Sequence, residues 1–250
     1  MTPRCPASPS GVDGITRSIR LFRAFRLEQS QPERFYRALA DDSIAHLARR
    51  VDLSGARVLD VGGGPGWFAD AFARAGAACV VVEPDRSELP EGGWREEVHG
   101  VLADGAALPF PDGAFDLSFS SNVLEHVARP WALADELVRT ARRGGLVFVA
   151  FTNWLSPWGG HETSPWHLLG GERAARRYYR RHDAPPKNRY LTSLFPVHVG
   201  AAMRWARAHP RADLVDARPR YLPAWCAWLV AVPGLREVAT WNLALVLRRR

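Results

Sequence analysis

The sequence is poor in lysine, and this bears on what its positive charge means. Lys187 is the only lysine among 33 basic residues, so the formal net charge of +7 comes almost entirely from arginine. The arginines stand in short, scattered clusters, whereas a nucleic-acid-binding module usually groups its basic residues on one recognisable element. We therefore expect no nucleic-acid partner.

Cysteine is also scarce, and long apolar runs are absent. Cys5, Cys79 and Cys226 form no C-x-x-C pair, which argues against a cysteine zinc site and a disulfide framework. Residues 1–14 contain no apolar run of the kind found in signal peptides. The longest strongly apolar stretch, residues 222–233, is too short to span a bilayer. These absences predict a cytoplasmic protein with a disordered leader over residues 1–14.

The same apolar stretch leaves one membrane alternative open. It contains Trp225 and Trp228 and has arginines on both sides, a pattern also found in segments that lie at a membrane surface. Peripheral contact with the inner face of the membrane is therefore kept as an alternative.

The order of elements predicts an α/β fold. From residue 56 onward, short apolar runs alternate with helix-like segments, the pattern of a parallel sheet covered on both faces. Two amphipathic helices are expected before it, over residues 15–27 and 32–50. The expected strands cover residues 57–61, 79–83, 98–103, 115–120, 146–151, 213–217 and 243–247, and the expected later helices cover residues 66–75, 131–142, 193–209 and an interrupted pair within 223–241.

A glycine-rich turn follows the first expected strand. Residues 58–68 read VLDVGGGPGWF, and glycines in such a strand–turn–helix unit let a ligand approach the backbone closely. The dinucleotide fingerprint requires G-x-G-x-x-G. Counted from Gly62, the third glycine of that fingerprint is replaced by Trp67, which disfavours a nicotinamide oxidoreductase.

Further motifs occur in order along the chain. Asp60, Gly62, Gly64 and Gly66 resemble the D-x-G-x-G-x-G loop of class I S-adenosylmethionine-dependent methyltransferases. Residues 80–83 (VVVE), 103–106 (ADGA) and 115–127 resemble three later motifs of that family. The flanks, including residues 35–36 and 159–162, resemble an uncharacterised group of actinobacterial methyltransferases. Among class I methyltransferases, the sequence resembles those of type 11.

This resemblance implies a fold and a cofactor site. The implied fold is Rossmann-like, with a mostly parallel seven-stranded sheet, an antiparallel last strand and helices on both faces. Glu83 would accept hydrogen bonds from the ribose hydroxyls, and Asp104 would accept a hydrogen bond from the adenine amino group. The backbone near Asn122 would face the methionine moiety. Asp85 would help bind the ribose or would only close its turn. The implied contacts with S-adenosylmethionine are Asp60, Gly62, Gly64, Gly66, Glu83, Pro84, Asp85, Asp104, Gly105 and Asn122.

The domain organisation follows from the same comparison. We expect one methyltransferase domain over residues 15–250. It would consist of N-terminal helices (15–55), a cofactor-binding core (56–151) and a substrate-side insertion with C-terminal strands (152–250). Seven of the ten tryptophans follow residue 150. Six of them would line an acceptor pocket or pack in the core: Trp154, Trp158, Trp166, Trp205, Trp225 and Trp228.

Methyl transfer from a sulfonium is an in-line displacement, so positioning supplies much of the catalysis. A hydroxyl acceptor would benefit from a general base, and His126 and His161 are the candidates. Glu125 is interpreted as a surface or capping group, and no set of residues stands out as a metal site. We expect a small-molecule, glycan or lipid-precursor acceptor, methylated at a hydroxyl. The alternative is a non-catalytic S-adenosylmethionine-binding regulatory or scaffold protein.

Overall fold

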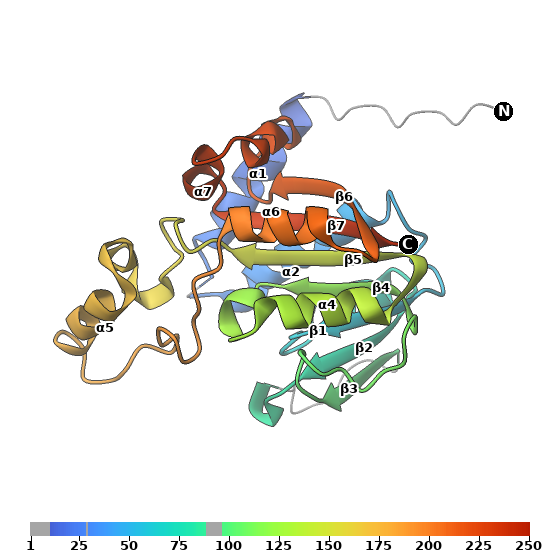
Figure 1. Ribbon diagram of the computed structural model, residues 1–250, viewed down its shortest axis with the longest axis horizontal. Helices are drawn as coiled ribbons and strands as arrows, with labels where there is room; N and C mark the ends of the chain where they lie inside the picture. Colours follow the sequence, from blue (N-terminus) through green and yellow to red (C-terminus); the bar gives the residue numbers. More distant parts are fainter. Residues whose placement is uncertain (1–10, 29, 89–96) are drawn as a thin grey trace.

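A seven-stranded sheet forms the centre of the protein (Figure 1). The computed structural model describes residues 11–28, 30–88 and 97–250. The strand order is β3-β2-β1-β4-β5-β7-β6, and β7 runs antiparallel to both of its neighbours while the pairs from β3 to β5 are parallel. The predicted fold class is confirmed. The strands are β1 (Arg57–Val61), β2 (Ala78–Glu83), β3 (Val98–Leu102), β4 (Phe115–Ser121), β5 (Ala141–Thr152), β6 (Ala212–Pro219) and β7 (Asn242–Arg249).

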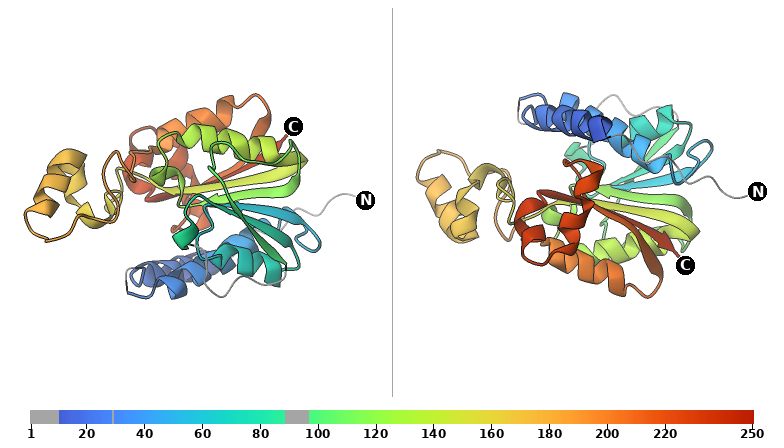
Figure 2. Two further views of the ribbon diagram at one scale, coloured as in Figure 1. Left: turned by 90° about the horizontal axis from the view of Figure 1, so that it is seen from below. Right: turned by 90° about the horizontal axis from the view of Figure 1, so that it is seen from above.

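Helices cover both faces of the sheet, as Figure 2 shows from two sides. One face carries α1 (Gly11–Phe25), α2 (Pro32–Leu47) and α3 (Trp67–Arg74), and the other carries α4 (Pro130–Thr140) and α6 (Val199–Ala208). Two further helices are α5 (Gly171–Tyr179) and α7 (Leu235–Ala239). The segment with α5 extends away from the sheet beyond the carboxyl end of β5 (Figure 1). None of the described helices is both long and apolar enough to cross a membrane.

The alternation of side chains along each strand produces two cores. Val58 packs among the residues that face α1, α2 and α3, whereas its neighbour Leu59 packs with α4 and α6. At the centre of the first core, the rings of Phe119 and Phe148 stack with their centroids 4.7 Å apart. Because both faces of these strands are buried, the apolar runs in their sequences are continuous.

Some boundaries differ from the predictions. Helix α1 begins at Gly11, so residues 11–14 of the expected leader are helical; residues 1–10 lie outside the described residues. Strand β5 begins at Ala141 rather than at residue 146. Helix α6 begins at Val199 rather than at residue 193, because His198 is extended and proline at position 196 disfavours a helical residue before it.

An ionic cluster fastens α2 to the C-terminal strands. The Asp216 carboxylate on β6 accepts a hydrogen bond from Arg218 Nε at 2.8 Å, and Arg50 Nη2 and His46 Nε2 lie 3.3 and 3.2 Å from it. These groups favour the ionised form against the cost of burial, and they lower the pKa of Asp216 to about 2. The cluster therefore helps to fix the N-terminal helices on the sheet.

Asp216→Asn should lower the free energy of unfolding by about 2 kcal/mol at pH 7. The ordinary pKa of 3.8 applies in the unfolded chain, so the stabilisation is complete above about pH 4 and is lost as the pH falls toward 2. Urea unfolding at pH 7, 4 and 3 measures this loss of stability. The control is Asp213→Asn on the same strand as Asp216, which removes the exposed ion pair between Asp213 and Arg250. Equal effects of both substitutions at pH 7 would contradict the prediction.

Candidate active site

The glycine loop between β1 and α3 adopts a backbone conformation that favours glycine. Gly62, Gly64 and Gly66 have φ values of +73°, +48° and +87°, which side chains with a Cβ rarely adopt. A Cβ on Gly62 would lie 2.4 Å from Val123 Cγ2, so this glycine is also required by packing. A Cβ on Gly64 would meet no heavy atom within 4 Å. The space in front of Gly64 is therefore free for a ligand.

Two acidic side chains border this loop at the carboxyl ends of β1 and β2. Glu83 Oε2 accepts a hydrogen bond from the Gly64 N–H at 3.1 Å, and burial raises the pKa of Glu83. Asp60 is fully buried, and burial together with the charge of Glu83 raises the pKa of Asp60 to about 8. Asp60 Oδ2 has no hydrogen-bond partner within the described protein. An unpaired buried oxygen beside an open glycine loop fits a polar ligand.

Asp85 and Asp104 follow β2 and β3, and each closes its own turn. Asp85 Oδ1 accepts from the N–H and the hydroxyl of Ser87, at 2.8 and 2.7 Å. Asp104 Oδ1 accepts from the Ala106 N–H at 2.8 Å. Both side chains are exposed, as is Pro84. Asp85 therefore does close its turn, which is one of the two roles considered for it. Contacts of these residues with a ligand stay predictions.

Gly105 and Asn122 also lie at this edge of the sheet. A Cβ on Gly105 would lie 2.8 Å from Leu133 Cδ1, so the residue is required for packing. Asn122 follows β4 with φ +58°, and its side-chain oxygen accepts a hydrogen bond from Asn242 Nδ2 at 2.9 Å. This bond ties the Asn122 side chain to β7. A contact between the Asn122 backbone and the cofactor stays a prediction.

The structure brings the two predicted histidines together. Their ring centroids are 5.0 Å apart, although 35 positions separate His126 from His161 in the sequence. His126 Nδ1 lies 2.9 Å from the carbonyl oxygen of Ser193. Because a carbonyl only accepts, Nδ1 carries the hydrogen, and a neutral His126 ring presents a lone pair at Nε2.

His161 stands in an unusual backbone conformation. Its φ of +48° lies in the left-handed region, and a non-glycine residue held there often marks a functional site. Its Nε2 is buried and has no hydrogen-bond partner within the described protein. Burial, with small contributions from His126 and His167, lowers the pKa of His161 to about 3. The imidazole of His161 is therefore neutral at physiological pH.

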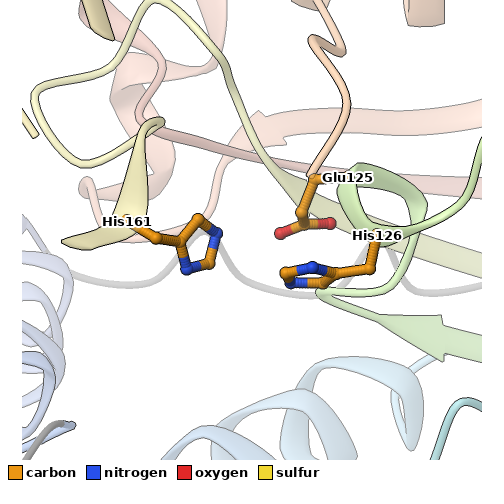
Figure 3. A group of neighbouring side chains, drawn as sticks. All are labelled: Glu125, His126 and His161. Carbon is orange, nitrogen blue, oxygen red and sulfur yellow. The ribbon is translucent and has the colours of Figure 1, made fainter. Parts of the chain in front are cut away.

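Glu125 corrects one interpretation of the sequence. It was expected at the surface, yet its side chain is only 2% exposed. Oε1 accepts a hydrogen bond from the Thr152 N–H at the end of β5, at 2.8 Å, while Oε2 has no partner within the described protein. Residues 124–126 form a single 3-10 turn directed inward, and the helix-like pattern of the sequence concealed this direction. Figure 3 shows Glu125 beside His126 and His161.

A cavity of about 740 Å³ adjoins His161. One wall comes from α1 and the turn after it, and no pattern in the sequence indicates this role. Glu28 belongs to that wall, and Tyr36 donates a hydrogen bond to Glu28 Oε1 at 3.3 Å. Burial is the main reason that the pKa of Glu28 rises to about 7. The lining residues are Phe22, Phe25, Arg26, Glu28, Thr152, Trp158, His161 and Glu162.

The tryptophans of the C-terminal region are divided between several environments. Trp158 lines the cavity, whereas Trp154 is nearly buried, with its ring centroid 5.0 Å from that of His167. Trp225 and Trp228 are exposed by 61% and 55%. Among the six tryptophans proposed for the pocket, Trp158 alone lines this cavity; the others include Trp166, beneath Arg177, and Trp205, bonded to Asp135.

Comparisons with known proteins agree with this geometry. A methyltransferase-domain family model matches residues 59–149. A protein of Mycobacteroides abscessus, described as an uncharacterized methyltransferase, is 50% identical over 249 residues that cover 94% of this chain and 95% of the relative. A protein of Mycobacterium marinum with the same description is 47% identical over 248 residues, with the same coverage. The chain belongs to this methyltransferase family.

A solved structure shares the fold of the methyltransferase. The S-adenosylmethionine-dependent methyltransferase of Mesorhizobium loti superposes with a TM-score of 0.54 at 18% identity, over 84% of this chain and 98% of the other. The family and the fold together give S-adenosylmethionine as the cofactor. The open space at Gly64, the unpaired oxygen of Asp60 and the acidic end of β2 fit such a cofactor.

Proposed function

We propose that this methyltransferase methylates a hydroxyl group of an acceptor that enters the cavity beside His161. The cofactor would bind along the carboxyl ends of β1 to β4, through the ten residues that the sequence indicates. The glycine loop, Glu125 and the end of β5 lie at the same edge of the sheet, where open α/β sheets bind their ligands. A donor and an acceptor held at this edge would be neighbours.

The observation that carries the proposal is the pair of histidines, of which His161 lines the cavity and His126 lies beside it. Bound S-adenosylmethionine supplies a methyl group on a positively charged sulfur. The hydroxyl of an acceptor is a weak nucleophile until its proton is drawn away. The lone pair of a neutral His126 ring lies on Nε2, because Nδ1 donates to the Ser193 carbonyl. His126 Nε2 would accept the hydroxyl proton while the oxygen attacks the methyl carbon and the bond from that carbon to the sulfur breaks. In His161 the donor Asn188 Nδ2 lies 3.5 Å from Nδ1, so the ring would first have to move its hydrogen from Nε2 to take the same role.

The walls of the cavity favour an acceptor with an apolar part. Phe22, Phe25 and Trp158 provide aromatic surface beside the polar groups. Small molecules, glycans and lipid precursors with a hydroxyl belong to this class. A lipid precursor would also give a role to the exposed Trp225 and Trp228, because aromatic side chains commonly rest at membrane surfaces. Peripheral membrane contact is part of the proposal for that acceptor alone.

An acceptor screen tests this function. The purified chain is incubated with S-adenosylmethionine and a panel of hydroxylated aromatics, glycans and lipid precursors, the last in anionic vesicles, and release of S-adenosylhomocysteine is measured. We expect turnover with an acceptor carrying a free hydroxyl and none with its methoxy counterpart, which is the matched control. Equal turnover with both compounds would refute the hydroxyl as the methylated group, and for a lipid precursor the chain should also pellet with the vesicles.

The alternative of a non-catalytic cofactor-binding protein predicts a different result. Such a protein would bind S-adenosylmethionine tightly and would release no S-adenosylhomocysteine with any member of the panel. The cavity beside His161 and the family both favour the enzyme.

A further inference from the structure

Three side chains able to ligate a metal ion converge beside the cavity. One ligand atom each from Glu125, His126 and His161 lies within 4.8 Å of the other two. In Figure 3 the carboxylate and the two imidazoles are directed toward a common space, with His161 approaching from the side opposite to the other two. Ligands around a metal ion at about 2.1 Å lie roughly 3–4 Å from one another, so small side-chain rotations would complete such a site.

Each of the three side chains directs an atom that can bind a metal ion toward this space. The contact of Asn188 Nδ2 with His161 Nδ1 at 3.5 Å places the lone pair of the neutral His161 ring on Nδ1, so a metal ion bound at Nε2 would displace a hydrogen from that nitrogen. Glu125 Oε2 and His161 Nε2 are buried and lack a hydrogen-bond partner within the described protein. For His126, the contact of Nδ1 with the Ser193 carbonyl leaves Nε2 without a hydrogen. A backbone carbonyl on the far nitrogen is also the usual support of a metal-binding histidine, because it fixes the ring and its tautomer.

The positions of Glu125 and His126 are further fixed by the backbone around them. The Phe195 N–H donates to the Glu125 carbonyl at 2.7 Å, and the Thr152 N–H donates to Glu125 Oε1 at 2.8 Å. Glu125 and His126 are therefore held between the end of β5 and the segment that precedes α6. The second carboxylate oxygen stays available, as a ligand should be.

The charge of the surroundings favours a cation. Glu28 and Glu162 line the cavity, and, after burial, the charges of Glu125 and Glu162 help to raise the pKa of Glu28. Arg26 is the one basic side chain among the residues that line this cavity. Asn188 Nδ2 donates to Glu162 at 3.0 Å, which compensates part of that charge. A bound cation would reduce the repulsion that remains.

We propose that Glu125, His126 and His161 bind one divalent transition-metal ion of the zinc type. Two imidazole nitrogens and one carboxylate oxygen form a set that suits Zn²⁺ and its neighbours, whereas Mg²⁺ and Ca²⁺ prefer oxygen ligands alone. Three protein ligands leave a coordination position open. Since His161 also lines the cavity, a molecule in the cavity can reach the ion.

The role of the ion in the reaction rests on the proposed function, but its binding does not. An acceptor hydroxyl on the open position would lose its proton more readily, because a metal ion lowers the pKa of an oxygen bound to it. The proton would pass to solvent water and the oxygen would attack the methyl carbon. The bond from that carbon to the sulfonium sulfur would break, and S-adenosylhomocysteine would leave. The two histidines then act as ligands, in place of the direct proton transfer described above.

Calorimetric titration of the tag-free, chelator-treated chain with ZnCl2 tests the site in the absence of any acceptor. We expect one ion per chain. Glu125→Gln keeps the acceptor for the Thr152 N–H, and this variant and His161→Gln should each bind Zn²⁺ at least about 100-fold more weakly. His99→Gln, which changes an exposed histidine on β3, is the control and should bind like the wild type. MgCl2 should give no comparable binding.

Further measurements make the result decisive. Titration with S-adenosylhomocysteine shows whether each variant is folded, and Co²⁺ in place of Zn²⁺ should give a visible absorption band that His126→Gln removes. Absence of saturable Zn²⁺ binding by the wild type would overturn the proposal, as would Zn²⁺ binding as tight as that of the wild type by the folded Glu125→Gln and His161→Gln variants. If Zn²⁺ binds as expected while the acceptor screen gives no turnover, the metal site stands and the proposed function fails.

Discussion

Replacing Glu83 by alanine should weaken the binding of S-adenosylmethionine by about 100-fold or more. The Glu83 carboxylate already holds the Gly64 N–H, and it would accept two hydrogen bonds from the ribose hydroxyls. Hydrogen bonds to a charged group contribute about 1.5 kcal/mol or more each, so the loss of two amounts to about 3 kcal/mol. Calorimetric titration with S-adenosylmethionine measures the change.

The comparison with neighbouring acidic residues makes this result specific. Glu88→Ala, at an exposed position five residues after Glu83, should leave the affinity for S-adenosylmethionine unchanged. Asp85→Asn separates the two roles weighed for that residue: a loss of affinity indicates ribose binding, and no loss leaves only the turn with Ser87. Burial raises the pKa of Glu83, so its carboxylate is poorly solvated and its removal should not lower the melting temperature. An affinity within threefold of wild type for Glu83→Ala would refute the assignment.

His161→Ala should lower turnover by about 100-fold to 10,000-fold and leave the affinity for S-adenosylmethionine unchanged. The substitution removes the imidazole at the cavity wall, whether it accepts the hydroxyl proton directly or holds a metal ion. The predicted cofactor contacts lie at the glycine loop and at or after the ends of β2, β3 and β4, on other parts of the chain. Single-turnover rates with the acceptor found in the screen, together with calorimetric titration of the cofactor, measure the two effects separately.

The control comes from the same segment of the chain. His182→Ala removes an exposed histidine after α5, whose Nδ1 lies 3.0 Å from the carbonyl oxygen of Tyr178, and it should turn over like the wild type. Unchanged turnover in His161→Ala would exclude His161 from the mechanism. A parallel loss of cofactor affinity would instead indicate that the substitution disturbs the edge of the sheet.

The sheet and the glycine loop were predictable because their signals are local. Apolar runs such as residues 57–61 and 79–83 are short, are bounded by turn residues, and depend on burial of both faces of the sheet. The conformations of Gly62, Gly64 and Gly66 are likewise determined within one turn. The boundaries of α1, β5 and α6 were less accurate, because helix ends and strand irregularities depend on tertiary contacts.

The cluster around Glu125 was not predictable in the same way. Whether His126 and His161 meet depends on the path of a long segment after β5, which has no regular period. The burial of Glu125 depends on the Thr152 N–H at the end of another strand. The wall formed by α1 posed a similar problem: the helical pattern of residues 15–27 shows that one side is apolar, but it does not show what that side faces.

The origin of the cavity walls has a consequence for how this enzyme can diverge. Phe22, Phe25 and Glu28 come from α1 and the turn after it, whereas the glycine loop belongs to the sheet. Mutations in α1 can therefore change the size and polarity of the compartment without altering the methyl-donor machinery. Related enzymes can therefore take different acceptors through substitutions in one peripheral helix, while the methyl-transfer chemistry stays the same.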